Sequence, residues 1–262
     1  KRATEFILSR SPDAPNSKAQ PWFLYFAFPS PHAPIIPNDQ FDGKSKAGPY
    51  GDFVHETDYA CGQILKALKA SGQAESTLVV FTADNGPEKY AYARDQKFDH
   101  WSSQPLRGLK RDIYEGGHHV PFIVRWPGKV EAGSTSEYPS SFPDMMPTFA
   151  EIAGISLDRP TDGHSLLPAF GGANPARQKD LYWEHGDQQA LRHGDWKLVR
   201  RKLGKKNPET KLFDLADDPG EKKDVSKQRP EILEMMIERA AATRFPSVIF
   251  PNPGLDPLSG PQ

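Results

Sequence analysis

Three short apolar runs alternate with polar and helical stretches in the first part of the chain. They cover residues 22–28, 78–82 and 121–126 and are rich in aromatic and β-branched side chains. Between the first two runs, apolar residues over 51–70 recur at helical spacing, and Gly72 follows where a helix commonly ends. Strands that alternate with helices predict an α/β fold with a mixed or parallel sheet flanked by helices.

The pattern changes beyond Asp180. Short runs with the sequences LYWEH, QALRH and WKLVRR follow one another, separated by Gly-Asp pairs, which is typical of an antiparallel meander. A helix is predicted over 230–242, and prolines crowd the end of the chain. We therefore predict an α/β part over residues 1–175, a small antiparallel sheet-plus-helix (α+β) subdomain over 176–244 and an extended tail over 245–262.

The composition narrows the function classes. With 33 Lys and Arg against 34 Asp and Glu, the 262-residue chain carries a formal net charge of −1, which argues against nucleic acid as a partner. Its apolar runs are far shorter than the roughly 20 residues that span a bilayer, so no membrane segment is expected. The single cysteine, Cys61, excludes an internal disulfide.

Two oxygen-bearing side chains, Asp84 and Asn85, follow directly after the apolar run 78–82. In open α/β sheets, ligands gather at the carboxyl ends of strands, so this carboxylate and amide suit Ca²⁺ or Mg²⁺. The alternative is that Asp-Asn-Gly is a plain turn, which the pair taken alone favours, so the metal site depends on the context of the other clusters.

Two further clusters suit an anionic substrate. His32 lies just past the run 22–28 in a proline-rich loop, where it could act as a general acid, or be an ordinary exposed histidine. Arg107, Lys110 and Arg111 place three cations close together, as a tetrahedral oxyanion site or a solvated basic loop would. Together with the oxygen pair, these clusters predict a hydrolase acting on a sulfate or phosphate ester.

Five motifs resemble, in order, those of the type I sulfatases, the formylglycine-dependent branch of the alkaline-phosphatase superfamily. They are FLYFAFPSPHAPIIP, VVFTADNGPE, LRGLKRDIYEGG-x-x-VPFIVRWPG, LRHGDWKLVR and LFDLADDPGE, and they span nearly the whole chain. The resemblance implies an alkaline-phosphatase-like fold. It also implies a sulfuric ester hydrolase, arylsulfatase-like, that removes sulfate from a carbohydrate, and a periplasmic or secreted location.

The resemblance assigns roles at matching positions. It implies that Asp84 and Asn85 hold a calcium ion, with Mg²⁺ or Mn²⁺ as alternatives. It implies that Lys110 binds the sulfate and that His32 contacts the sulfate near its leaving oxygen. These roles agree with the chemistry of the residues, because metal and lysine neutralise anionic oxygens while an imidazole can protonate an alkoxide.

Two departures from the family pattern affect the expected activity. His119 stands where the family usually has Arg before Val-Pro. The family derives its formylglycine nucleophile from a Cys/Ser-x-Pro-x-Arg motif, which we expect N-terminal to this chain. Cys61 is followed by Gly-Gln-Ile and is interpreted as a buried helical cysteine. We therefore expect a C-terminal part of a sulfatase, inactive alone, whose oligomeric state the sequence does not predict.

The predicted subdomain carries candidates for substrate recognition. His185 and Arg192 could contact the hydroxyl or sulfate groups of a sulfated small molecule or glycan, whereas Trp183 and Trp196 favour core packing over sugar stacking. Two alternatives stay open. One is a phosphodiesterase or phosphonate monoester hydrolase of the same superfamily, since a metal and a lysine suit phosphate equally well. The other is a non-catalytic remnant that binds sulfated glycans.

Overall fold

The computed structural model describes residues 1–14, 20–252 and 254–256, and its chain divides into two compact units, treated separately below. The first unit comprises Lys1–Val80, Tyr90–Ser102 and Val124–Ala132. The second unit comprises Phe81–Lys89, Ser103–Ile123 and Gly133–Gln262.

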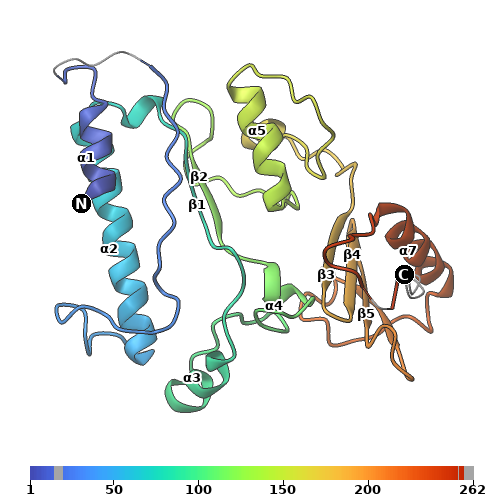
Figure 1. Ribbon diagram of the computed structural model, residues 1–262. Helices are drawn as coiled ribbons and strands as arrows, with labels where there is room; N and C mark the ends of the chain where they lie inside the picture. The colour runs from blue at the N-terminus through green and yellow to red at the C-terminus, as the bar shows by residue number, and fades with distance from the viewer. Residues whose placement is uncertain (15–19, 253, 257–262) are drawn as a thin grey trace. The chain divides into compact units, whose positions relative to one another are not determined.

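Two helices lying side by side build the core of the first unit (Figure 1). They are α1 (Arg2–Ser9) and α2 (Gly48–Ala70), and the second confirms the predicted helix over 51–70. Ile7, Ala67 and Leu68 are nearly inaccessible to solvent and pack together. The helical spacing of apolar residues thus produces the buried seam that holds the helices together.

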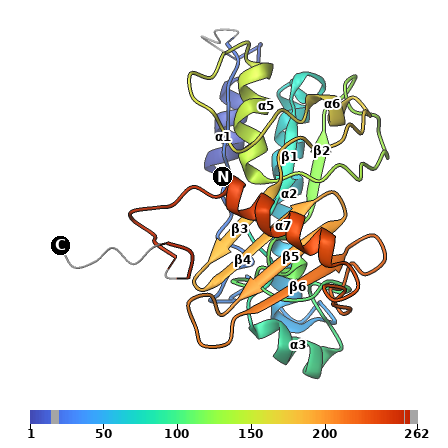
Figure 2. The same cartoon turned by 90° about the vertical axis from the view of Figure 1, so that its right-hand side faces the viewer.

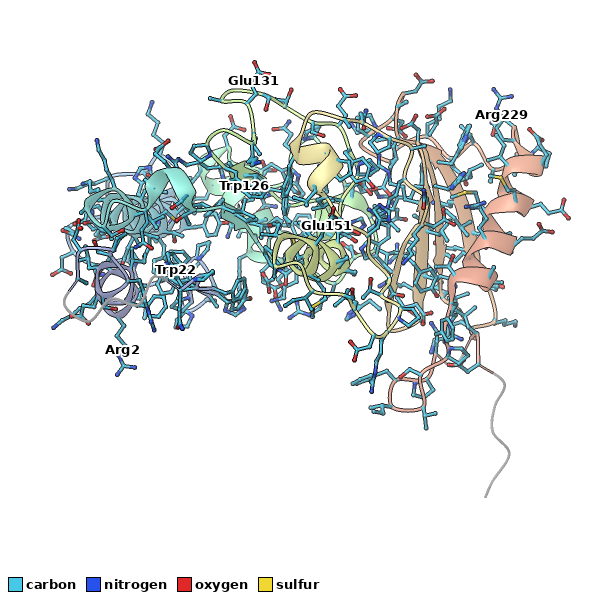
Figure 3. All side chains as sticks on the ribbon, turned by 90° about the horizontal axis from the view of Figure 1, so that it is seen from above. Arg2, Trp22, Trp126, Glu131, Glu151 and Arg229 are labelled. Atoms are coloured by element: carbon cyan, nitrogen blue, oxygen red, sulfur yellow. The ribbon has the colours of Figure 1, made fainter. Side chains whose placement is uncertain are left out.

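The segment 22–28 corrects the first predicted strand. It belongs to no strand among the described residues, and Phe23 and Tyr25 are 66% and 81% exposed. Trp22 is held differently, since its ring lies edge-on 5.8 Å from that of Phe6 and its Nε1 donates to Gln73. Figure 3 shows Trp22 beside α1. An apolar run signals a tendency to be buried, but a strand also needs hydrogen-bonding neighbours.

The other two predicted strands are confirmed. They are β1 (Val79–Thr82) and β2 (Phe122–Arg125), which pair in a two-stranded sheet. Between them the chain forms α3 (Tyr90–Phe98) and the single-turn α4 (Glu115–His118). A short 3₁₀ helix (Ala74–Ser76) precedes β1.

The second unit contains a four-stranded antiparallel sheet with the order β3-β4-β5-β6. This confirms the predicted meander and adds one strand to it. Positive φ angles at Gly186 and Gly194 make the two predicted Gly-Asp turns, a conformation that glycine adopts without steric cost. The strands are β3 (Leu181–His185), β4 (Gln188–His193), β5 (Trp196–Arg201) and β6 (Glu209–Asp214).

Each face of this sheet is covered by a different element. Helix α7 (Pro230–Thr243) lies across one face (Figure 2), where Leu198 and Leu212 pack against Met236. On the other face Val199 and Phe213 pack against Tyr114, which belongs to the loop before α4. Alternation along the strands therefore directs one set of side chains to the helix and the other to this loop.

The remaining helices of the second unit are short. A 3₁₀ turn (Phe142–Asp144) leads into α5 (Met145–Ile152), and α6 (Leu167–Phe170) follows. Of the predicted tail over 245–262, residues 253 and 257–262 lie outside the described residues. The predicted boundaries at 175 and 244 stay predictions. In the described part of the chain, no helix is long and apolar enough to cross a bilayer.

Candidate functional site

Two loops of the second unit that the sequence analysis singled out separately lie against each other. The amide of Lys110 donates to the carbonyl of Pro87 at 2.8 Å, and the amide of Gly86 donates to the carbonyl of Gly117 at 2.9 Å. A Cβ at Gly86 would stand 1.9 Å from the carbonyl oxygen of Gly116, so the loops approach this closely because residue 86 is glycine. The structure thus joins the predicted metal pair to the loop of the predicted sulfate-binding lysine.

The Asp84-Asn85 pair offers two hard oxygen ligands. Asp84 is exposed, and the Asn85 side-chain nitrogen donates to the carbonyl of Gly86 at 2.9 Å, so its amide oxygen is directed away from that bond. Calcium takes about six to eight oxygens. The pair fits part of such a site by donor type. The described residues contain no group of three or more His, Cys, Asp or Glu side chains that could hold a metal by themselves.

The three cations of the Lys110 loop do not act as one cluster. Arg111 pairs with Glu88 at 2.6 Å, and the pKa of that carboxyl is lowered by the Lys89 amide and by this guanidinium. Arg107 donates to the carbonyl of Glu221 at 2.9 Å. Both arginines are engaged in the fold. The half-buried Lys110, whose charge also acts on Glu88, is therefore the cation of this loop best placed to receive an anion.

Arg107 is also the last residue of a sequence that matches the nucleophile motif of the family. Residues 103–107, with the sequence SQPLR, fit Cys/Ser-x-Pro-x-Arg by letter, a match that sequence reasoning overlooked. In the structure the Ser103 hydroxyl donates to the carbonyl of Gly108 at 3.3 Å, and the Arg107 guanidinium lies 4.0 Å from the centre of the Tyr114 ring. These residues therefore serve the fold of the Lys110 loop.

A buried ion network behind this loop is the main feature that the sequence did not reveal. Lys197 of β5 is fully buried, with its Nζ 2.7 Å from Glu115 Oε1 and 3.2 Å from Glu221 Oε1. Burial alone raises the pKa of Glu115, but the hydrogen bond from His119 and the Lys197 charge outweigh it and hold that pKa well below its usual range. Burial raises the pKa of Glu221, although Lys197 opposes the shift.

Two adjacent histidines border the network. The His118 ring stacks on Trp183 at 4.0 Å, and its Nε2 lies 3.0 Å from Lys197 Nζ. His119, at the position where the family usually has Arg, lies with Nδ1 3.1 Å from Glu115 Oε2. Burial and the Lys197 charge lower the pKa of His118 from 6.5 to about 3, so its imidazole is neutral in the folded chain.

Acidification is expected to destabilise the fold through His118. Its pKa lies near 6.5 when unfolded and lower when folded, so below pH 6.5 the unfolded state binds the extra proton. The free energy of unfolding should then fall by about 1.4 kcal/mol per pH unit between about pH 6 and pH 4. Urea unfolding at several pH values measures this slope. We expect His118→Phe to remove most of this slope; an unchanged slope in His118→Phe would contradict the prediction.

The other predicted site residues fall in different places. His32 is exposed in a loop of the first unit, with Nδ1 2.7 Å from the carbonyl of Ala33. Its proximity to Lys110 therefore stays a prediction. His185 is exposed at the end of β3, opposite Gln188, whose side chain donates to the carbonyl of Arg111 at 3.3 Å. This end of the sheet is therefore tied to the Lys110 loop.

Arg192 lies nearer the buried network than a purely substrate-binding role would predict. Its Nη1 is 3.6 Å from Glu115 Oε2, and its side chain is 20% exposed. Trp183 packs against the core under the loop and Trp196 packs against the α7 side, as expected for core residues.

Comparison with solved structures gives the class of fold. The crystal structure of Ps i-CgsB in complex with k-i-k-neocarrahexaose superposes with a TM-score of 0.77 at 29% identity, over 90% of this chain and 52% of that chain. The phosphonate monoester hydrolase of Agrobacterium radiobacter superposes with a TM-score of 0.57 at 25% identity, over 75% and 40%. The chain has an alkaline-phosphatase-like α/β fold that is incomplete, with a small antiparallel subdomain.

The family follows from sequence comparison. The Sulfatase family matches residues 1–155, and the family described as N-sulphoglucosamine sulphohydrolase, C-terminal, matches residues 109–244. The N-acetylgalactosamine-6-O-sulfatase of Bacteroides thetaiotaomicron is 30% identical over 90% of this chain and 48% of its own length. The chain belongs to the sulfatase family, and it spans about half the length of this relative.

Proposed function

We propose that this chain contributes the sulfate-binding and part of the metal-binding machinery of a sulfuric ester hydrolase, active in the full-length protein. The observation that carries the proposal is the pair of backbone hydrogen bonds between the Asp84-Asn85 loop and the Lys110 loop. They hold an ammonium group and two hard oxygen ligands on adjoining loops of one compact unit. Such a pairing suits an anionic ester, whose charge needs neutralising on more than one side.

Each group has a role that its chemistry allows. The Lys110 ammonium would bind sulfuryl oxygens and stabilise the charge that develops on them. His32 would donate a proton to the departing alkoxide. A calcium ion held partly by Asp84 and Asn85 would supply positive charge at the sulfate. The formylglycine nucleophile would come from the rest of the protein, so this chain by itself would be inactive.

The substrate class we propose is a sulfated carbohydrate. Two similar proteins bear names that point this way: an N-acetylgalactosamine-6-O-sulfatase, and a structure in complex with a neocarrahexaose. His185 is exposed at the sheet end that contacts the Lys110 loop, where it could contact the sugar. Arg192 could contribute from the partly exposed side of its guanidinium. A periplasmic or secreted location completes the proposal and rests on the family resemblance.

A phosphonate monoester hydrolase is the second candidate. A solved enzyme of that name shares the fold. A lysine together with a metal ion suits a phosphoryl group as well as a sulfuryl group. The two candidates differ in the ester that is cleaved, so a direct comparison of substrates separates them.

The test uses the full-length protein with sulfated saccharides and an aryl phosphonate monoester, each with calcium or with a chelator. We expect faster turnover of the sulfate ester and loss of activity with the chelator. Asp84→Ala should raise the calcium concentration needed for half-maximal activity, whereas Asp95→Ala on α3, also exposed, should not. Faster phosphonate turnover would establish the second candidate. Glycan binding without turnover of either ester would refute a hydrolase.

A further inference from the structure

We propose that Lys197 is a positioning residue, which fixes the Lys110 loop through the buried carboxylates of Glu115 and Glu221. This inference rests on the proposed function, because it takes Lys110 to be the sulfate-binding group that must be held in position. The residues that carry it lie within the second unit. Lys197 is far from Lys110 in the sequence and belongs to a motif that the sequence analysis used only for the resemblance.

Lys197 occupies a buried place in the antiparallel sheet. It lies on β5, opposite Arg192 of β4 and Phe213 of β6, and its side chain is fully inaccessible. This face of the sheet packs against the loop before α4. Lys197 therefore presents its charge from a rigid element directly beneath the loop, with Trp183 and His118 beside it.

A chain of ionic and hydrogen bonds runs from Lys197 into the Lys110 loop. Glu221 receives the Lys197 charge, and its carboxylate accepts the amide hydrogen of Glu115 at 2.6 Å. The Glu221 carbonyl accepts from Arg107 at 2.9 Å. The carbonyl of Arg107 in turn accepts the amide hydrogen of Gly116 at 2.6 Å. Both ends of the segment that carries Lys110 are thus tied to Glu221, which Lys197 holds in place.

The buried ion network suits a positioning role better than a purely stabilising one. Replacing a buried ion pair with packed apolar residues is often neutral for stability, so a stabilising role alone gives little reason for three buried charged groups. Charged hydrogen bonds are short and directional, and therefore constrain where a loop lies more tightly than apolar contacts do. Arg192 and His119 add two contacts to Glu115 from the partly exposed side. The network is suited to fixing geometry.

The experiment is a double-mutant cycle between Lys197→Met and Lys110→Ala in the full-length protein, assayed on a sulfate ester. Displacement of a catalytic group by about 1 Å can cost on the order of 100-fold, so we expect Lys197→Met alone to lower kcat/KM by about 10- to 100-fold. In the Lys110→Ala background it should cost less than about twofold, because the group it positions is gone. The exposed Lys205→Met is the matched control and should change nothing.

Hydrogen exchange gives a readout that does not depend on activity. Lys197→Met should speed exchange of amides over 107–117 while the amides between β5 and β6 stay protected. Equal costs of Lys197→Met in both backgrounds, or unchanged exchange in the loop, would overturn the positioning role. Failure of the proposed function is distinguishable, because sulfate-ester turnover would then be absent or unaffected by Lys110→Ala while exchange in the loop still responded to Lys197→Met.

A milder variant covers the case in which Lys197→Met does not fold. Glu221→Gln removes one charge but keeps an oxygen that can accept from the Glu115 amide. We expect the same non-additivity with Lys110→Ala and the same local exchange, with a smaller loss in kcat/KM. Additive losses in this variant would overturn the proposal equally.

Discussion

Lys110→Ala is expected to lower kcat/KM for a sulfate ester about 100- to 1,000-fold in the full-length protein, the range for losing one preorganised group that stabilises transition-state charge. Lys110 is half-buried, and both neighbouring arginines are engaged elsewhere, so neither arginine is free to replace it. Inorganic sulfate should also inhibit the variant more weakly. Steady-state kinetics with sulfate as competitor measures both effects.

Lys89→Ala is the matched control for this experiment. Lys89 is exposed on the Asp84-Asn85 loop, and its amide donates to Glu88. Its replacement by alanine removes one positive charge, as Lys110→Ala does, but leaves the proposed anion-binding lysine in place. We expect kcat/KM to stay within about twofold, as for most surface changes. Equal losses of kcat/KM in Lys110→Ala and Lys89→Ala would show that only the net positive charge of these loops matters. That result would contradict the role of Lys110 as the sulfate-binding residue.

Arg177→Met is expected to lower the free energy of unfolding by about 3–5 kcal/mol, because it leaves a buried carboxylate without its counter-charge. Asp144 is fully buried, and Arg177 donates to its two oxygens at 2.8 and 2.9 Å. The amides of Ser141 and His164 donate to the same carboxylate at 2.8 and 3.0 Å. One side chain thus organises the start of α5 and the segment that follows it.

Urea unfolding followed by tryptophan fluorescence tests this prediction. Lys202→Met removes a cation from a solvent-exposed pair with Glu209 and should change the free energy of unfolding by less than about 1 kcal/mol. A loss below about 1 kcal/mol in Arg177→Met would mean that Asp144 is stabilised by its backbone donors alone.

The elements that the sequence predicts well are those whose periodicity is set locally. Helical spacing of apolar residues predicts α2, and a helix is also predicted where α7 lies. Short apolar runs predict the strands at 79–82 and 122–125, and Gly-Asp turns between short runs predict the meander. The run 22–28 failed because strand pairing depends on neighbours that its own residues do not specify. Strand β6 was missed because its alternating polar residues carry a weak apolar signal.

For the site, local sequence identified chemistry but not connectivity. Asp84 and Asn85 are predicted from their residue types and their position after a strand, and Lys110 from a cluster of three cations and the family resemblance. The structure brings their loops together. Lys197 and Glu221 were not found, because ordinary charged residues in a polar sequence give no sign of burial. The two-residue alternation of side chains along β5 is a signal for this burial, because it places Lys197 on the same face of the sheet as the buried Val199.

The bond between Glu115 and Glu221 also sets an order of events during synthesis. The two residues are 106 positions apart, so at about 5–20 residues per second the ribosome needs roughly 5–20 s to deliver the second after the first. Until then the Lys110 loop lacks its bonds to Glu221 and is held only by its contacts with the earlier Asp84-Asn85 loop, although its own residues have already left the ribosome. A nascent chain that ends before residue 197 should therefore keep this loop accessible to proteases, and release of the C-terminal strands should close it.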